Sequence, residues 1–535
     1  MRTEVLVIGG GATGIGILRD LAMRGIDALL IEQGVIVHGT SSRYHGLLHS
    51  GARYAVKDIE AARECIEENR ILRRIGRSCV EETTGYFLQV EGDDPAFVDL
   101  WTEGCTKSGI PFTEIDPAAA LLEEPNLAKD LTRVFEVPDA AIDGFRMAWQ
   151  VLESACRYGA NFLTYTKLDS FIIKSGTIKG VKVINTLDGT KKTISCDYVV
   201  NATGPWAGEV TRLAGLDCTV SPSKGTMICF NKRIVSRIIN KLRPPGNGDI
   251  FVPHGPITIL GTSSLPVESP EDTSSSWEEI EELLKVGETV IDNLRRFRVL
   301  RVFAGSRPLY VPKGTSGGRN ATRGFHIIDH EEEGLTGLLT ITGGKLSTFR
   351  LMAERFTDIL ELKIKGFNTP CRTADEPFVP EVEAEAKDKA RHLFPSYGVN
   401  LAATRLGVEK FQQVVELMED DSSLCKVICE CENVTLAELK LIAEEETSHS
   451  LDDLRRRTRM GMGSCQANYC TLRAAAAVKK YLGITTPTLE VMKTFLKGRF
   501  KGIHKVLSGN TLRAAEMTRG MYQLLFNVNG AKPKP

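Results

Sequence analysis

The length, composition and charge of the chain exclude several classes of protein. Its 535 residues correspond to roughly three folding units of about 100–200 residues each. Hydrophobic residues make up 42% and charged residues 25%, so the chain is neither disordered nor a collagen-like or coiled-coil rod. Lys and Arg number 67 against 68 Asp and Glu. Because the net charge is only -1, we expect no nucleic-acid partner and no charge-driven binding to a membrane.

The chain shows no predicted leader or membrane span. The apolar run in MRTEVLVIGG is too short for the core of a signal peptide, and no later segment offers about 18 uncharged apolar residues. The 13 cysteines, an odd number, argue against a secreted disulfide framework. We therefore expect a cytoplasmic protein, whose contact with a membrane would come through an amphipathic surface or a partner subunit.

The first unit opens with a β-α-β pattern. Residues 4–8 and 27–31 are short apolar runs, and residues 13–24 place apolar side chains at near-helical spacing. This order predicts parallel strands joined by a right-handed crossover. Residues 198–202 and 338–342 are further buried strands of the same type, so we expect a sheet assembled from distant segments.

A second, more antiparallel sheet is predicted inside the first unit. Residues from about 80 to 195 and from about 217 to 325 contain alternating apolar stretches. Apolar residues recur at helical intervals after Leu346, which predicts an amphipathic helix. The sequence therefore divides into an oxidoreductase-sized unit at 1–365, a linker and helical region at 366–424, and a C-terminal module at 425–535.

A glycine-rich turn connects the first predicted strand and helix. Gly9, Gly11 and Gly14 form GxGxxG, and Glu32 ends the next strand. These glycines allow a tight turn and a close approach of a pyrophosphate to the helix N-terminus, while the carboxylate can accept hydrogen bonds from a ribose. The pattern predicts dinucleotide binding; the alternative is a turn with a packing role only.

Residues 39–54, GTSSRYHGLLHSGARY, read as a loop that wraps a charged ligand. The segment is too polar for a strand core and too rich in glycine for an ordinary helix start. His49 is the candidate base, since histidine can accept an alcohol proton near neutral pH. The alternatives are a solvated loop and a structural histidine.

Basic residues beside glycines mark a candidate anion site. Arg307 lies in AGSRPL, Lys345 in TGGKLSTFR and, more weakly, Arg323 in NATRGF. Cations drawn together from distant segments would suit a phosphorylated small substrate, because arginine binds phosphate through two donors and lysine as a point charge. Ordinary surface charges are the alternative.

Two cysteine pairs distinguish the C-terminal module. CxC and CxxxxC are separated by 33 residues, and the four thiolates can ligate a 2Fe-2S cluster or, less readily, a tetrahedral zinc; they belong to Cys429, Cys431, Cys465 and Cys470. A basic run precedes the second pair, at Arg455, Arg456, Arg457 and Arg459. We interpret this run as a solvated helix face; the alternatives are that it raises the potential of the cluster or docks an acidic partner.

Taken together, several motifs resemble the FAD-dependent glycerol-3-phosphate dehydrogenases. They are GGGATGIGILRDLAMRG, HGLLHSGARYAV, NATGPWAG, AGSRPL and TGGKLSTFR, and they follow the order of that family over nearly the whole chain. The four-cysteine tail makes the resemblance closest to the A subunits of the anaerobic enzymes. The implied fold class is α/β: a Rossmann-like FAD domain interleaved with an α+β substrate domain of the glycine-oxidase and D-amino-acid-oxidase type.

The resemblance also implies the site residues. Substrate positioning and phosphate binding would fall on Arg53, Tyr54, Arg307, Arg323 and Lys345. Flavin contacts would fall on Gly9, Gly11, Gly14, Glu32, Thr40, Ser41, Ser42, Gly204, Gly344 and Leu346. The tail is similar to the ferredoxin-like 2Fe-2S module associated with bacterioferritin, whose second pair is CxxC. This chain has CQANYC, so Cys470 stays open as a ligand.

The implied activity is oxidation of sn-glycerol 3-phosphate to dihydroxyacetone phosphate by hydride transfer to the flavin N5, with His49 as the candidate base. A membrane-anchoring iron-sulfur subunit, together with a second flavoprotein-like subunit, would pass electrons to a quinone, which would place the chain on the inner face of the cell membrane. Two other hypotheses are a flavin dehydrogenase for an amino acid or 2-hydroxy acid, and an electron-transfer subunit whose flavin is reduced by a partner.

Overall fold

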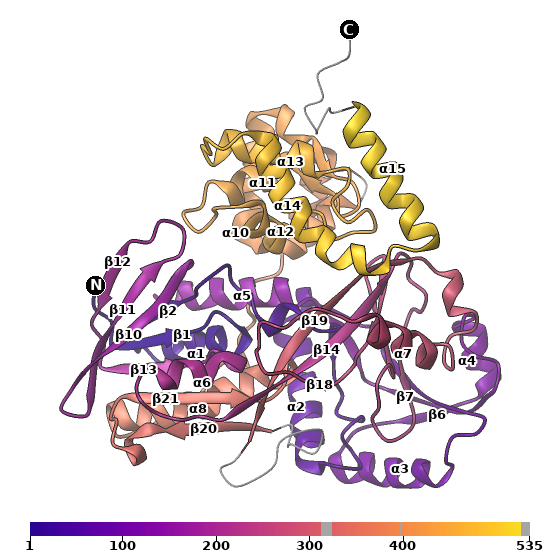
Figure 1. Cartoon of the computed structure of the whole chain (residues 1–535), viewed down its shortest axis with the longest axis horizontal. Helices are drawn as coiled ribbons and strands as arrows, with labels where there is room; N and C mark the ends of the chain where they lie inside the picture. The colour runs from indigo at the N-terminus through magenta and orange to yellow at the C-terminus, as the bar shows by residue number, and fades with distance from the viewer. Residues whose placement is uncertain (312–323, 396, 526–535) are drawn as a thin grey trace.

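Three parts of the chain can be followed in Figure 1: a sheet built around the N-terminus, a larger sheet beside it, and a helical C-terminal module above both. The computed structural model describes residues 1–311, 324–395 and 397–525. The α/β class predicted from the sequence is confirmed.

The first part is a six-stranded, Rossmann-like sheet. In spatial order its strands are β20 (Phe325–Asp329), β21 (Leu338–Gly343), β13 (Tyr198–Asn201), β1 (Val5–Ile8), β2 (Ala28–Ile31) and β9 (Asn161–Leu163). All neighbours are parallel except β20 and β21. The sheet therefore combines segments far apart in sequence, as the isolated buried strands predicted.

Both faces of this sheet are covered, because successive side chains of a strand point to opposite faces. Val5 and Val7 share a core with three helices, which are α1 (Ala12–Met23), α5 (Gly144–Arg157) and α8 (Phe349–Lys365). Leu6 and Ile8 pack instead against a three-stranded antiparallel sheet and α6 (Ala207–Arg212); its strands are β10 (Thr166–Lys174), β11 (Thr177–Asn185) and β12 (Lys191–Ile194). Burial on both faces explains the continuous apolar runs of these strands.

The second part is a nine-stranded, mostly antiparallel sheet. Its strands in spatial order are β18 (Leu265–Pro266), β14 (Val220–Phe230), β17 (Ile257–Gly261), β16 (Ile250–His254), β15 (Ile238–Lys241), β5 (Gly85–Val90), β7 (Leu131–Val137) and β6 (Thr113–Ile115), with β19 (Val299–Tyr310) on β14. Helices α2 (Ile59–Ile75) and α3 (Ala96–Ser108) pack on one face, and α4 (Pro117–Glu123) and α7 (Trp277–Gly287) on the other. A small sheet joins the two parts and consists of β3 (Leu47–Leu48), β8 (Ala140–Ile142) and β4 (Val80–Glu81).

The insertion expected at 80–195 is too wide at its C-terminal end. Helix α5 shares the core of α1, β9 joins the Rossmann-like sheet, and β10–β12 cover that sheet's second face. Residues 144–194 therefore belong to the first part. The physical reason is that alternation identifies a strand but carries no information on which sheet the strand joins.

The C-terminal module is mainly helical. Its elements are α9 (Ala384–Ala390), α10 (Gly398–Asp420), β22 (Val427–Cys429), β23 (Val434–Thr435), α11 (Leu436–Ala443), α12 (Leu451–Thr458), α13 (Thr471–Tyr481), α14 (Thr488–Ile503) and α15 (Gly509–Leu525). One apolar core runs through it from Val382 to Tyr522. The helices at 384–420, assigned from the sequence to a separate region, thus belong to this module, which we define as residues 382–525.

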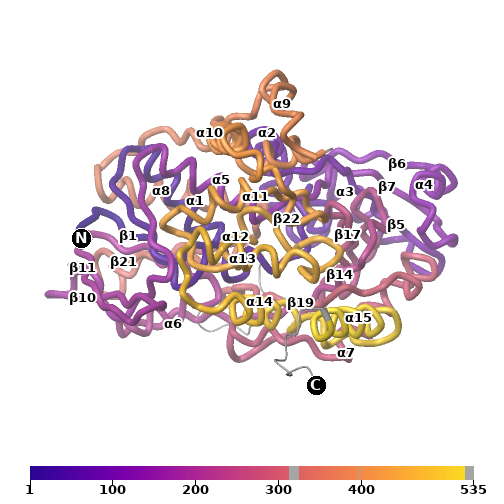
Figure 2. The backbone as a smooth tube through the Cα atoms, turned by 90° about the horizontal axis from the view of Figure 1, so that it is seen from above, coloured from indigo at the N-terminus to yellow at the C-terminus, as the bar shows by residue number. Residues whose placement is uncertain are grey.

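The C-terminal module lies over both sheets, as Figure 2 shows from above. Helix α12 packs on α5 of the first part, and α14 packs on β19 of the second. Among the described residues, no helix combines the length and the apolar character needed to cross a bilayer.

Candidate functional site

The glycine-rich turn between β1 and α1 depends on the absence of side chains. Gly9 has φ of +112°, and a Cβ there would lie 2.7 Å from the carbonyl oxygen of Ala202. A Cβ on Gly14 would overlap the carbonyl oxygen of Gly9. The first glycine therefore makes the turn, and Gly14 lets the helix start pack directly on the strand end.

The start of α1 presents polar groups to a cavity. Its N-cap residue is Gly11, which has no capping side chain, and Ser41 Oγ accepts from the backbone N-H of Ala12 at 3.0 Å. Glu32 accepts from Gly10 N at 2.8 Å and from Gly34 N at 2.9 Å, and burial raises the pKa of its carboxyl group. A helix N-terminus beside a strand-end carboxylate suits a pyrophosphate and a ribose.

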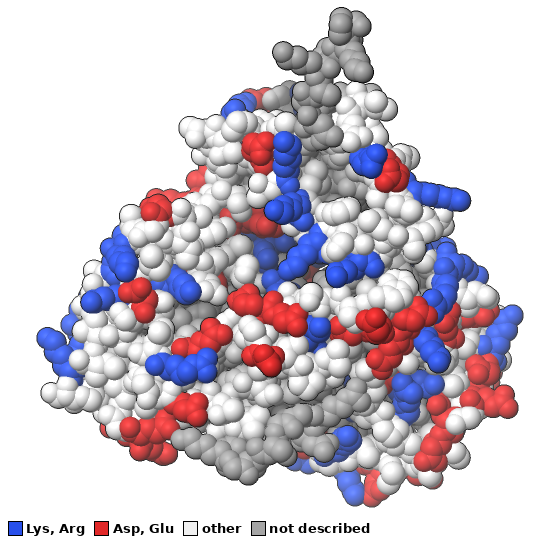
Figure 3. Space-filling model, viewed as in Figure 1, with Lys and Arg blue, Asp and Glu red and all other residues white. Residues whose placement is uncertain are grey.

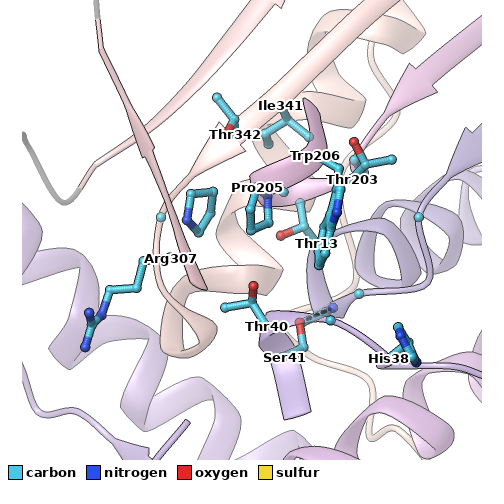
Figure 4. A pocket seen from close by; sticks show the side chains of 18 of the residues that line it. Thr13, His38, Thr40, Ser41, Thr203, Pro205, Trp206, Arg307, Ile341 and Thr342 are labelled. Carbon is cyan, nitrogen blue, oxygen red and sulfur yellow. Dashed lines mark hydrogen bonds between the residues drawn. The ribbon is translucent and has the colours of Figure 1, made fainter. Parts of the chain in front are cut away.

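The cavity has a volume of about 650 Å³ and extends from this turn to the nine-stranded sheet. In Figure 4, Arg307 lies at one side and His38 at the other, with Thr40 and Pro205 between them. Most candidate residues line it, namely Gly9, Gly11, Glu32, Thr40, Ser41, His49, Tyr54, Gly204, Arg307, Gly344, Lys345 and Leu346. Its size and its donors fit a dinucleotide cofactor with space for a small substrate.

Arg307 is positioned by the nine-stranded sheet. It lies on β19, and its Nη2 donates to Thr262 Oγ1 at 2.7 Å and to Ser263 O at 3.1 Å. A Cβ on Gly225 of the neighbouring strand β14 would overlap the guanidinium group. Gly225 and Thr262 therefore fix the orientation of Arg307, and neither is marked by any motif in the sequence.

Two histidines and a tyrosine lie beside this arginine. The His49 ring is 5.7 Å from that of His45 and 5.4 Å from that of Tyr54, and Lys345 Nζ is 4.9 Å from the Tyr54 ring centroid. Burial, with Arg307 and Arg53 adding to it, lowers the pKa of His45 to about 3. His45 is thus neutral, and its Nδ1 accepts from Leu47 N at 3.1 Å, which leaves the ring proton on Nε2.

Sequence reasoning singled out His49 and missed His45. Both line the cavity. The available signal was their spacing of four residues within one glycine-rich segment. A loop has no fixed periodicity, however, so this spacing did not show that both rings would face the same cavity.

Three described candidate residues of the first part, Arg53, Ser42 and Gly14, do not line the cavity. Arg53 donates to Asp249 Oδ2 at 2.9 Å and to Gly246 O at 3.2 Å. Its guanidinium group is therefore bound to the loop before β16 of the nine-stranded sheet. Ser42 donates to Gly39 O, and Gly14 has the packing role described above. Arg323 lies outside the described residues.

The four cysteines of the C-terminal module form two pairs. A hydrogen bond joins Cys429 to Cys470 and lowers the pKa of the first thiol while raising that of the second. A second bond joins Cys431 to Cys465 with the same pattern. Within residues 1–311, 324–395 and 397–525, no three His, Cys, Asp or Glu side chains could hold one metal ion. Two pairs suit a centre with two irons, each held by two thiolates, better than a single zinc held by four.

Although the loop between Cys465 and Cys470 is longer than in the CxxC motif, Cys470 still lies beside Cys429. Gln466 and Ala467 adopt left-handed φ values of 52° and 77°, which fold the loop back on itself. The thiol of Cys470 is buried. Its placement beside Cys429 supports all four cysteines as ligands.

The basic run is not a solvated helix face. Arg456, Arg457 and Arg459 are all less than 10% exposed. Arg457 stacks on the Trp149 ring at 4.3 Å, and Arg459 donates to Asp143 at 2.7 Å and to Glu432 at 3.0 Å. The solvated interpretation is wrong because these arginines face α5 and the loops of the first part.

Arg459 joins the C-terminal module to the first part through a buried ion triad. Asp143 also caps α5, by accepting from the backbone N-H groups of Phe145 and Arg146 at 3.1 Å. Removing the guanidinium would leave two buried carboxylates without the cation that they share. We therefore expect Arg459→Met to destabilise the protein by about 3–5 kcal/mol, measured from the denaturant midpoint.

The control is Arg519→Met on α15, where an exposed arginine pairs with an exposed glutamate. Surface pairs contribute about 0–1 kcal/mol, so its midpoint should barely move. Equal midpoints for the two variants would show that the triad does not stabilise the fold.

Fold and site together define an oxidoreductase that binds a dinucleotide and carries a two-iron module. Comparisons with known proteins agree. Residues 4–350 match the family described as FAD dependent oxidoreductase, and residues 427–482 match the BFD-like [2Fe-2S] binding domain. FAD and a 2Fe-2S cluster, both expected from the sequence, are thereby confirmed as cofactors.

A curated relative from Haemophilus influenzae, named as the A subunit of anaerobic glycerol-3-phosphate dehydrogenase, is 39% identical over 100% of this chain and 95% of its own. The chain belongs to this family of FAD-dependent glycerol-3-phosphate dehydrogenase A subunits. The resemblance stated from the motifs is confirmed.

Solved structures share the fold. Glycerol-3-phosphate dehydrogenase from Bacillus halodurans, complexed with FAD, has a TM-score of 0.66 at 21% identity and covers 95% of this chain and 96% of its own. Glycine oxidase from Bacillus cereus has a TM-score of 0.54 at 19% identity and covers 71% of this chain and 99% of its own. The expected glycine-oxidase type of fold is confirmed.

Proposed function

We propose that the chain oxidises sn-glycerol 3-phosphate to dihydroxyacetone phosphate; its relatives are named as subunits of glycerol-3-phosphate dehydrogenase. Electrons would leave through the 2Fe-2S module and partner subunits to a quinone. The observation that carries this proposal is that Arg307, Lys345 and His49, from three separate segments, line one cavity, in which the Tyr54 ring contacts both Lys345 and His49. Two cations beside a histidine suit a phosphate next to an alcohol that must lose a proton.

The residues divide the work between binding and proton transfer. Arg307 binds the substrate phosphate, held in orientation by Thr262. Lys345, which lies over the Tyr54 ring, adds a second cation. His49 takes the proton of the C2 hydroxyl, and the neutral His45 donates its Nε2 proton to a substrate oxygen. Holding the alcohol in this orientation supplies most of the protein's own contribution.

The first part of the chain holds the cofactor. The N-terminus of α1 would bind the pyrophosphate, Glu32 the ribose, and the backbone at Gly204, Gly344 and Leu346 would line the flavin end. When bound, FAD supplies the acceptor for the hydride that leaves C2 of the substrate.

The names of the relatives support a proposal about partner subunits. The relatives are named as one subunit of a larger enzyme. We propose that this chain binds a membrane-anchoring iron-sulfur subunit, together with a second flavoprotein-like subunit, and that these partners connect it to the quinone. It would then lie at the inner face of the cell membrane without a spanning helix of its own in the described residues.

A substrate comparison tests the assignment. Purified protein is assayed with an artificial electron acceptor and sn-glycerol 3-phosphate, glycerol, lactate or amino acids. We expect kcat/KM for sn-glycerol 3-phosphate to exceed that for glycerol at least about 100-fold, because glycerol lacks the charge that Arg307 and Lys345 bind. Faster oxidation of lactate or an amino acid would support another substrate, and no reduction by any of them would support a partner-fed flavin.

His49→Gln tests the base. We expect kcat to fall about 100- to 1000-fold with little change in KM, because proton transfer is lost while phosphate binding remains. The control is His392→Gln, which changes an exposed histidine of the C-terminal module that does not line the cavity and should keep kcat within about threefold. An unchanged kcat in His49→Gln would assign the proton to another group.

A further inference from the structure

Five arginines gather where the C-terminal module meets the two sheets. We refer to them as the arginine bridge: Arg43, Arg301, Arg455, Arg456 and Arg499. They come from the loop after β2, strand β19 and helices α12 and α14. Figure 3 shows basic side chains on the viewer's face of the C-terminal module, above acidic side chains of the sheets.

The positive charge of the bridge is poorly compensated. Arg455 pairs with Asp452 at 2.9 Å, and within the described ranges no other member forms an ion pair with a carboxylate. The Nε atoms of Arg301, Arg456 and Arg499 are buried, and no described group accepts from them. Asp452 also attracts Arg301, Arg456 and Arg499, but one carboxylate balances only part of five positive charges, so an excess of positive charge remains among the described residues of the bridge.

One end of the bridge contacts the wall of the cofactor cavity. Arg456 Nη1 donates to Val37 O at 2.7 Å and to Ser42 Oγ at 3.3 Å. The residues between these two, His38 to Ser41, line the cavity. Arg456 is therefore fixed directly behind the loop that would hold the flavin.

The other end contacts the loop that carries Cys465. Arg499 Nη2 donates to Gly461 O at 3.1 Å and to Gln466 Oε1 at 2.6 Å. Arg301 Nη1 reaches the same Gln466 oxygen at 3.4 Å. Arg499, which is buried, and Arg301, which is half-buried, thus both contact the side chain of the residue that follows Cys465.

The arginines also act on one another electrostatically, in addition to the effect of burial. Burial, with Arg455 adding to it, lowers the pKa of both Arg301 and Arg456 to about 10. Burial lowers the pKa of Arg499 as well, and Arg301 and Arg455 contribute to the shift. Arginine nevertheless stays protonated in proteins at neutral pH.

We propose that the arginine bridge makes the 2Fe-2S centre easier to reduce, by placing buried positive charge between it and the cofactor cavity. This inference rests on the proposed electron route and goes beyond it. A cluster held by thiolates is a net anion, and each electron that it accepts adds negative charge. Buried cations nearby stabilise the reduced form, because hydrogen bonds, charge and burial set such potentials.

The experiment is a dye-mediated spectroelectrochemical titration of the complete holoprotein. Arg499→Gln removes one buried charge at the cluster end, Arg499→Lys keeps it, and Arg473→Gln removes an exposed arginine that pairs with Glu430 on the same module. We expect Arg499→Gln to lower the equilibrium constant for one-electron reduction of the cluster about tenfold, which is about 59 mV. Arg499→Lys and Arg473→Gln should stay within about twofold of the parent.

An unchanged cluster potential in Arg499→Gln would overturn the proposal. An equal drop in Arg499→Lys would also overturn it, because shape rather than charge would then matter. If Arg499→Gln fails to fold, Arg301→Gln carries the same expectation through the same Gln466 contact. The titration draws its electrons from the dyes, so a normal set of potentials in a protein that ignores glycerol 3-phosphate would contradict only the proposed function.

Discussion

Replacing Arg307 with alanine is expected to raise the KM for sn-glycerol 3-phosphate about 100-fold while FAD stays bound. The guanidinium lies in the cavity on a rigid strand, where Thr262 and Ser263 orient it. Losing one partner of a buried charge pair costs about 2–5 kcal/mol, and each 1.4 kcal/mol is about a tenfold change in binding. Steady-state kinetics and the flavin absorbance per chain measure both effects.

The matched control for this variant is Arg243→Ala. Arg243 follows β15 of the same nine-stranded sheet and binds Asp249 Oδ1 at 2.6 Å, but it does not line the cavity. Its removal should leave the KM within about twofold of the parent value. A KM that does not change in Arg307→Ala, with cofactor content normal, would remove Arg307 from the phosphate site.

Gly14→Ala is expected to abolish FAD binding and destabilise the first part of the chain by about 1–3 kcal/mol. The added methyl group would overlap the carbonyl oxygen of Gly9, so the start of α1 must move away from the end of β1. Overpacking against backbone costs about 1–3 kcal/mol, and the pyrophosphate site at the helix start is displaced as well. FAD content and thermal unfolding report the two losses.

Gly498→Ala provides the control. Gly498 is also within a helix, α14, but a Cβ there meets no atom within 4 Å. Alanine should stabilise this helix by up to about 1 kcal/mol and leave FAD bound. Normal FAD content in Gly14→Ala would mean that the turn tolerates a side chain and is not the pyrophosphate site.

Local sequence patterns predicted the start of the first unit well, because the contacts that shape β1, the turn and α1 join residues only a few positions apart. The alternation of β1, turn and α1 follows from apolar runs and three glycines, and the structure places α1 at Ala12–Met23 against the expected 13–24. Gly14 illustrates why: its role depends on Gly9, only five residues away. Short-range sterics of this kind are encoded in the sequence itself.

Long-range relations could not be predicted in the same way. No local sequence pattern indicates that β9 joins the sheet of β1 or that α10 shares the core of the C-terminal module. The arginine run looked solvated because its own helix offers no buried partner. Arg459 donates a hydrogen bond to Asp143, which is 316 residues away in the sequence.

In the candidate site, too, short-range features were predicted from the sequence and long-range contacts were not. Arg307 and Lys345 were recognised by their neighbouring glycines, whereas Thr262, which orients Arg307, belongs to a segment without any motif. Arg53 was expected to bind the substrate phosphate, whereas in the structure it donates a hydrogen bond to Asp249. Partner choice among several nearby carboxylates and cations is settled by packing, which a single sequence does not contain.

An anaerobic absorbance titration of the purified protein with sn-glycerol 3-phosphate tests the central claim most directly. The flavin band and the broader iron-sulfur absorption are followed together as substrate is added. We expect stoichiometric substrate to bleach the flavin band, with loss of the iron-sulfur absorption as electrons reach the C-terminal module. A flavin spectrum that does not change with sn-glycerol 3-phosphate, in protein that dithionite reduces normally, would contradict the assignment.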